Sequence, residues 1–355
     1  MTITRFQQRR HSFCPGLQAA LAVALLVVLD GTPFAAAQTA AFSSFRTVDS
    51  RREGGVPAAV VTAIAAEPRA GLLLTAGDDR KIRVYEAWGD RLLFTVPGEE
   101  WVHALDADPT GRWFAAADGL GTVTLGSLAA ATSAKRVKVA NSALRAVKFS
   151  PDGRSLAVAG FEPTVWILDV ATGRVAAELP VGSADLRAIA FSPDGKFLAA
   201  TGRSGNVRLW TVADLRPAGD LPLSHRRLRA LAFSPDGKLL AAGGDEGAVI
   251  FYDLVNRATV DRWELPSGAV TVLAFCGTDR LAVGTTENLI VVYDAASRSA
   301  VADLRGHTGT IACLSYLAEQ DVLASGSFDT TAQFWRLDRG PFVSERRRVL
   351  PEPLR

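Results

Sequence analysis

Three stretches of the chain are nearly identical: AVKFSPDGRSLAVAG at residues 146–160, AIAFSPDGKFLAATG at 188–202 and ALAFSPDGKLLAAGG at 230–244. Each places an apolar run on both sides of the tetrapeptide Ser-Pro-Asp-Gly. In this tetrapeptide proline presets φ, aspartate can bond back to the backbone, and glycine accepts a positive φ. Each stretch therefore predicts two β-strands joined by a tight corner.

The same pattern recurs along most of the chain with a period near 42 residues. An aromatic residue before the corner marks the clear copies, and weaker copies extend the series in both directions. The equivalent positions are Ala66, Ala107, Phe149, Phe191, Phe233, Phe275 and Tyr316. Each copy also contains a third strand after a polar turn and a variable fourth strand. Seven four-stranded copies over residues 58 to about 340 indicate the blades of a β-propeller.

The third strand of each copy is similar to that of a known family. These strands read VYE, LGS, ILD, LWT, FYD, VYD and FWR, and the position favoured by a large residue holds Tyr85, Gly126, Leu168, Trp210, Tyr252, Tyr293 and Trp335. With the period and the corners, this pattern resembles the WD40-repeat β-propeller family, although no Trp-Asp dipeptide occurs. The resemblance implies an all-β, seven-bladed propeller with four antiparallel strands per blade.

The seventh copy resembles the family most fully. Family blades are often held by a hydrogen-bonded Asp, His, Ser/Thr and Trp, and the matching residues here are His307, Asp329, Trp335 and either Ser325 or Ser327. In such a set the imidazole bridges the carboxylate and the hydroxyl, which in turn reaches the indole N–H, so that buried polar groups are satisfied. The resemblance implies a structural role for this network.

The propeller ring has to close, because open sheet edges promote aggregation. The family usually borrows a strand from the opposite terminus. Two segments compete for this role, Phe45–Asp49 before the first blade and Phe342–Val349 after the last third strand. We expect both ends to meet in blade seven, with the N-terminal strand completing that blade or lying beside the C-terminal one.

The N-terminus reads as an export signal of the bacterial type. A basic start with three arginines precedes an apolar run at 17–29, and Ala35-Ala36-Ala37 forms a small-residue cleavage site. The 13-residue run is shorter than the roughly 17–25 residues of a membrane span. We predict cleavage after Ala37 and a periplasmic or secreted protein with no remaining membrane span; an uncleaved anchor is the alternative.

These assignments divide the chain into four parts. The predicted parts are a signal peptide at 1–37, a linker with a possible closing strand at 38–57, the propeller at 58–340, and a C-terminal strand or tail at 341–355.

The charge balance and the cysteines exclude some functions. The chain has 39 Lys and Arg and 37 Asp and Glu, of which the signal holds three and one, so the mature chain would be neutral. A neutral chain lacks the basic excess of a nucleic-acid binder, and we expect no such partner. Cys276 and Cys313 fall at different depths of neighbouring blades, so we expect free core thiols rather than a disulfide.

The sequence contains no converging set of catalytic groups. After the signal, the histidines His103, His225 and His307 lie on three separate blades, without metal-ligand spacing. No haem-attachment motif, nucleophile elbow or phosphate-binding loop occurs. The corner aspartates are too isolated to supply the six to eight oxygens that calcium needs. We therefore expect no catalytic residue, no metal and no cofactor.

One set of residues goes beyond the needs of the fold. At the start of the first strand, the seven copies carry Thr62, His103, Arg145, Arg187, Arg229, Thr271 and Ala312. If the family geometry applies, this strand lines the central channel, and three arginines gather at its mouth. Arg226 and Arg227 precede the third of these arginines, and Trp101 occupies the aligned loop position on blade two.

Two interpretations of this set stay open. Arginine forks and indole rings are good interface anchors, so the set could bind an acidic peptide or a carboxylate. Alternatively, the arginines pair locally with Asp185, Glu99 or Glu100, or repeat duplication copied an arginine that has no function of its own. The sequence as a whole predicts a non-catalytic protein-interaction platform outside the cytoplasm, either a monomeric disc or a subunit of a complex. The alternative is a propeller enzyme or a small-ligand binder at the channel mouth.

Overall fold

The computed structural model describes residues 59–337 with their side chains, apart from 68, 70, 87–90, 130–133 and 298, and the backbone of residues 40–42 and 46–49. These residues belong to one compact unit that starts at Ala40. No helix among them is long and apolar enough to cross a membrane. The predicted signal at 1–37 and the predicted tail at 341–355 lie outside the described residues.

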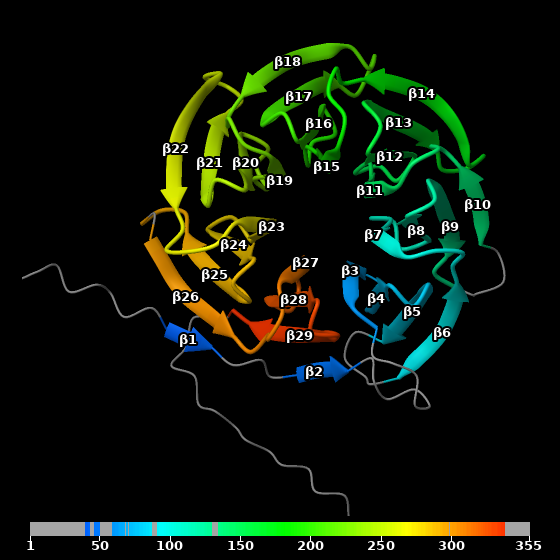
Figure 1. Cartoon of the computed structure of the whole chain (residues 1–355), viewed down its shortest axis with the longest axis horizontal. Helices are drawn as coiled ribbons and strands as arrows, with labels where there is room; N and C mark the ends of the chain where they lie inside the picture. The colour runs from blue at the N-terminus through cyan, green and yellow to red at the C-terminus, as the bar shows by residue number, and fades with distance from the viewer. Residues whose placement is uncertain are drawn as a thin grey trace, which may run out of the picture. The chain divides into compact units, whose positions relative to one another are not determined.

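Seven antiparallel sheets follow one another in chain order around a central channel, as the repeat predicts (Figure 1). In the first three blades the strands run from the channel outward. Blade one contains β3 (Val61–Glu67), β4 (Leu72–Gly77), β5 (Lys81–Glu86) and β6 (Leu92–Pro97). Blade two contains β7 (Val102–Ala107), β8 (Trp113–Asp118), β9 (Thr122–Ser127) and β10 (Lys135–Lys138). Blade three contains β11 (Leu144–Phe149), β12 (Ser155–Gly160), β13 (Thr164–Asp169) and β14 (Arg174–Pro180).

The next three blades repeat the arrangement. Blade four contains β15 (Leu186–Phe191), β16 (Phe197–Gly202), β17 (Asn206–Thr211) and β18 (Pro217–Pro222). Blade five contains β19 (Leu228–Phe233), β20 (Leu239–Gly244), β21 (Ala248–Asp253) and β22 (Ala258–Glu264). Blade six contains β23 (Val270–Cys276), β24 (Arg280–Thr285), β25 (Leu289–Asp294) and β26 (Ser299–Arg305).

The N-terminal segment closes the ring in blade seven. This blade contributes β27 (Ile311–Leu317), β28 (Val322–Ser327) and β29 (Thr331–Arg336), and β2 (Arg46–Asp49) pairs antiparallel with β29 as its fourth strand. The prediction of a terminal strand in blade seven is confirmed, and the strand is the N-terminal candidate. The competing segment Phe342–Val349 lies outside the described residues.

A second closing strand was not predicted. Strand β1 (Ala40–Phe42) pairs in parallel with β26 and gives blade six a fifth strand. The described N-terminal backbone therefore contacts two neighbouring blades. Three residues carry no periodic signal, which is why the sequence did not reveal this strand.

The Ser-Pro-Asp-Gly corners form through local hydrogen bonds. In blade three the Ser150 hydroxyl donates to Asp152 Oδ1 at 2.6 Å and accepts from the Ser155 amide at 2.9 Å. Gly153 has a φ of 70°, which glycine adopts without a steric penalty. These aspartates act within their own turns.

In each blade, a pair of opposite residues on the second and third strands packs in the core. In six blades a leucine faces the large-residue position, as Leu198 faces Trp210. Blade two reverses the sizes: Phe114 lies opposite Gly126, and a Cβ on that glycine would lie 2.3 Å from the phenylalanine ring. The missing large residue of the third strand is therefore supplied by the second strand.

The two described cysteines are both free thiols. Burial raises the pKa of each to about 12. Neither thiol is therefore ionised at neutral pH; Cys276 is a buried core residue, and Cys313 lines the central cavity.

Candidate functional site

The antiparallel strands place two sets of loops on one face of the ring. The segment before each first strand and the hairpin between the second and third strands lie at the same end of a blade. Backbone bonds join neighbouring loops there: the Asp185 amide donates to the Phe161 carbonyl at 3.0 Å, and the Arg203 amide donates to the Asp185 carbonyl at 3.1 Å. We call this the mouth face; the Pro-Asp-Gly corners lie on the opposite face.

A β-bulge occurs at the same place in every first strand. In blade three, for example, the register shifts between Leu144 and Ala146, so that Arg145 is the extra residue. A bulge redirects the side chain of its extra residue. The seven extra residues all line a central cavity of about 210 Å³; they are Thr62, His103, Arg145, Arg187, Arg229, Thr271 and Ala312. The structure thus brings the three arginines that the alignment selected to one channel.

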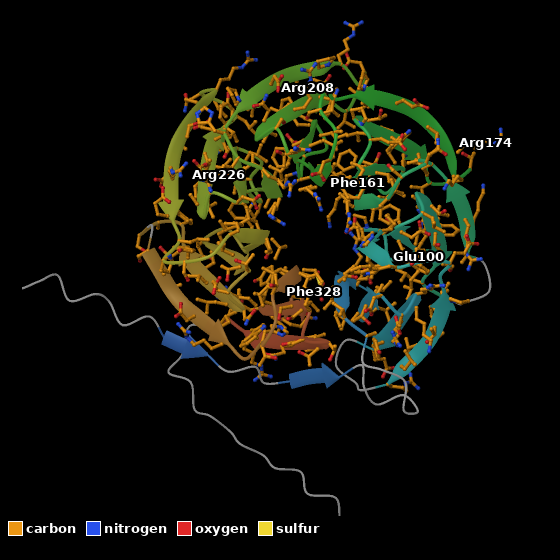
Figure 2. The ribbon with its side chains drawn as sticks, in the orientation of Figure 1. Glu100, Phe161, Arg174, Arg208, Arg226 and Phe328 are labelled. Carbon is orange, nitrogen blue, oxygen red and sulfur yellow. The ribbon has the colours of Figure 1, made fainter. Side chains whose placement is uncertain are left out.

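An exposed phenylalanine joins two of these arginines. Phe161, in the hairpin between β12 and β13, has its ring centroid 4.9 Å from Cζ of Arg145 and 5.2 Å from Cζ of Arg187. Both distances are within the range of a cation–π interaction. The ring is 36% exposed and lies toward the channel (Figure 2). Phe161 was not among the predicted site residues, because the hairpin residues differ from copy to copy and the repeat alignment does not select them.

A single buried carboxylate faces two guanidinium groups. Asp185 lies 2.6 Å from Arg187 Nε and 3.0 Å from Arg227 Nη2. Its φ of 62° is in the left-handed region, which aspartate tolerates better than most residues. This pairing is one of the local pairings that the sequence suggested. One carboxylate cannot neutralise both guanidinium groups, so one net positive charge remains.

Arg145 faces a neutral ring instead of a carboxylate. Its Nη1 atom lies 3.1 Å from Nδ1 of His103. Burial lowers the pKa of His103 to about 4, helped by Arg145 and Arg187, so the imidazole is neutral at pH 7 and accepts a hydrogen bond. Within the part of the chain that the structure describes, no carboxylate forms an ion pair with Arg145.

These contacts define a basic sector, made of Arg145, Arg187, Arg227 and Asp185 beside Phe161. Three guanidinium groups and one carboxylate give it two net positive charges. Burial and then the charge of Arg187 lower the pKa of Arg145, and the charge of Asp185 partly offsets this lowering.

The other predicted residues are placed differently. Arg229 pairs with Asp245 and is neutralised, while the Arg226 side chain is exposed and is not part of the sector, although it directly precedes Arg227 in the chain (Figure 2). The Trp101 ring packs against the His103 ring, with the two ring centroids 4.8 Å apart.

The two remaining acidic candidates pair elsewhere. Glu99 lies 3.4 Å from Arg136, and Glu100 lies 3.9 Å from Arg80. Of the three carboxylates that the sequence offered as local partners, only Asp185 forms an ion pair within the basic sector.

Blade seven contains the hydrogen-bonded set that the resemblance implied. His307 Nδ1 lies 2.8 Å from Asp329 Oδ2, His307 Nε2 lies 2.8 Å from the Ser325 hydroxyl, and the Trp335 indole donates to that hydroxyl at 2.8 Å. Although burial opposes it, hydrogen bonds from His307 and Thr331 hold the pKa of Asp329 well below its usual range. Ser327 bonds to the Gly309 carbonyl instead and is not part of the set.

Among the described residues, no group of three or more His, Cys, Asp or Glu side chains could hold a metal ion.

Seven four-stranded blades around a lined channel make this chain a repeat β-propeller. The family model "WD domain, G-beta repeat" matches residues 176–211 and 298–336, and the model "Anaphase-promoting complex subunit 4 WD40 domain" matches residues 210–278. WD40 repeat models thus match three stretches of this seven-bladed propeller, and WD40 propellers are typically protein-interaction scaffolds and generally non-catalytic.

The chain is also similar to a named protein of this kind. It is 32% identical over 98 residues to the "Guanine nucleotide-binding protein subunit beta" of Schizosaccharomyces pombe. The aligned part covers 27% of this chain and 32% of that protein, so the match spans about a third of the relative's length.

Proposed function

We propose that this propeller is a non-catalytic interaction platform outside the cytoplasm, and that its basic sector binds an acidic segment of a protein partner. The observation that carries the proposal is Arg145, which forms no ion pair among the described residues, next to Arg187 and the exposed Phe161 ring. The export signal predicted at residues 1–37 supports the location. The proposal keeps the scaffold role that is typical of the family.

The chemistry of the sector suits a carboxylate. A guanidinium group offers a planar fork of N–H donors that matches a carboxylate, and such charge-assisted hydrogen bonds are among the stronger ones in proteins. An arriving carboxylate would also reduce the repulsion between Arg145 and Arg187. Aromatic and arginine side chains are enriched among residues that dominate interface energies, and Phe161 supplies the apolar contact area.

The alternative of a small-ligand binder has less support. The central cavity of about 210 Å³ is smaller than the roughly 300–1,000 Å³ of most small-molecule pockets. An acidic side chain entering from the mouth face needs far less room. The channel therefore favours a protein segment over an enclosed small ligand.

Site-specific photocrosslinking in the source cells would test the proposal. A photoreactive phenylalanine analogue replaces Phe161, or, as a matched control, Phe328, which is also exposed on the equivalent hairpin of blade seven (Figure 2). We expect position 161 alone to capture one partner through a segment containing Asp or Glu. Adding Arg145→Glu and Arg187→Glu should abolish the capture, whereas Arg226→Glu should not.

Two results would contradict the proposal. Equal capture at positions 161 and 328 would show that the basic sector does not direct binding. Capture that survives the reversal of both charges would show the same. Fractionation tests the location separately, and we expect the protein outside the cytoplasm with Gln38 as its first residue.

A further inference from the structure

A second cavity opens between blades three and four. It has a volume of about 380 Å³ and is lined by polar side chains that include Ser183, Ser204, Asn206, Arg208 and Asp220. This volume falls in the range of ordinary binding pockets. Figure 2 shows Arg208 nearer the outer edge of the ring and Phe161 nearer the channel, so the cavity lies outward from the basic sector.

The lining is polar, with its charges balanced. Arg208 Nη1 lies 3.2 Å from Asp220 Oδ2, which neutralises the one cation and the one anion of the cavity. The Ser183 hydroxyl donates to the Ser204 hydroxyl at 3.3 Å, and the Asn206 amide adds further donors and an acceptor. Arg208 Nε is buried and has no hydrogen-bond partner among the described residues.

This lining selects a neutral polar group. A carboxylate entering the cavity would approach Asp220, and a cation would approach Arg208. An apolar group would cover hydroxyl and amide groups without bonding to them, which is unfavourable. A carboxamide or a hydroxyl can both donate and accept, which matches a lining of hydroxyl, amide and paired charged groups.

One short segment forms the wall between the cavity and the basic sector. Ser183 lines the cavity, and Asp185, two residues later, pairs with Arg187 and Arg227. This segment is bent, so the Cα atoms of Ser183 and Asp185 lie at most about 7 Å apart, a distance that two residues of a bound extended peptide would span. The backbone of Gly202 packs closely against this wall. A Cβ on Gly202 would lie 2.1 Å from the Asp185 carbonyl oxygen, so no larger residue fits there.

We propose that this cavity is a second subsite for the same partner, and that it binds an Asn, Gln, Ser or Thr side chain two or three residues from the acidic residue in the basic sector. The inference rests on the proposed function, because it assumes that a peptide segment occupies the mouth face. It adds a sequence preference that a basic patch alone would not impose.

Peptide selection on the mature protein tests both levels. Displayed random peptides are selected against the wild type, the Arg145→Glu/Arg187→Glu variant and Ser183→Leu, which fills the cavity. The matched control is His225→Leu, at the equivalent exposed loop position before blade five. Thermal melts first establish that all variants are folded.

We expect the peptides selected by the wild-type protein to share an acidic residue and an Asn, Gln, Ser or Thr two or three positions away from it. Ser183→Leu should keep the acidic preference and lose the second one, the charge-reversal variant should lose the acidic preference, and His225→Leu should keep both. For one selected peptide, alanine at the second position should weaken binding about tenfold to the wild type and leave Ser183→Leu unaffected.

The outcomes distinguish a failure of this inference from a failure of the proposed function. Acidic peptides without a second preference, or a second preference that survives Ser183→Leu, would overturn this inference and leave the proposed function standing. Selection without any acidic preference would overturn both.

Discussion

Replacing Asp185 with asparagine removes the one carboxylate among the described residues that forms an ion pair in the basic sector, and it changes little else. Asparagine also tolerates the left-handed backbone at this position, where φ is 62°. Arg187 and Arg227 would then face a neutral amide, and the sector would carry three net positive charges instead of two. The variant should therefore be less stable and bind acidic peptides more tightly.

The size of both effects follows from the geometry. The Asp185 side chain is 12% exposed, and its two arginines are 22% and 28% exposed. Loss of this partly buried partner lies between the values for surface and buried ion pairs, about 1–3 kcal/mol. Removing a negative charge roughly 6 Å from a bound carboxylate gains about 1 kcal/mol after screening, or roughly a fivefold lower Kd.

Fluorescence anisotropy with a labelled acidic peptide, at low and high salt, measures the gain, and a thermal melt measures the loss. Asp321→Asn is a matched control: Asp321 has a φ of 50° and lies 2.7 Å from Arg280, but it belongs to the opposite face. We expect it to lower Tm without changing peptide affinity. Unchanged or weaker peptide binding by Asp185→Asn would refute the assignment of the sector as an anion site.

Three further predictions concern stability. His307→Ala should lower the unfolding free energy by about 2–4 kcal/mol, because it leaves buried partners unsatisfied; an unchanged thermal melt would refute this. The folded state holds His103 neutral, with a pKa of about 4 against 6.5 for the free side chain, so stability should fall as the pH drops from about 6.5 to about 4. In urea denaturation at each pH, His103→Gln should lose less over this range, and equal losses would contradict the assignment. Gly126→Ala should destabilise blade two by about 1–3 kcal/mol in the same assay, and Phe114→Leu should recover part of that loss if the two residues share one space.

The fold could be predicted because its determinants are local and repeated. The Ser-Pro-Asp-Gly corners set the strand register within each copy, and the 42-residue period counts the blades. The closing strand β2 was one of two candidate segments, proposed from its offset before blade one, and the structure decides in its favour. Strand β1 could not be predicted, since its three residues pair in parallel with β26, far away in the sequence, and form no pattern of their own.

The candidate site was predictable in position but not in charge. Alignment of the copies selected Arg145, Arg187 and Arg229, because the same bulge recurs in every first strand. Which of them is neutralised depends on contacts through space that the alignment does not contain. For example, Arg227, which forms an ion pair with Asp185, comes from the loop before the following blade.

The difference between the three arginines lies in the hairpins, where the copies diverge. The residue directly after β12 is Phe161, which packs beside Arg145 and Arg187 without neutralising them. The residue at the same place after β20 is Asp245, which neutralises Arg229. Strands that share the sequence Leu-Arg-Ala therefore present a guanidinium at the same position in three blades. In blades three and five the first hairpin residue decides whether this guanidinium is neutralised, whereas in blade four Asp185 of the preceding loop pairs with it. The basic sector lies at blades three and four because the copy at blade five carries an acid where blade three carries an aromatic ring.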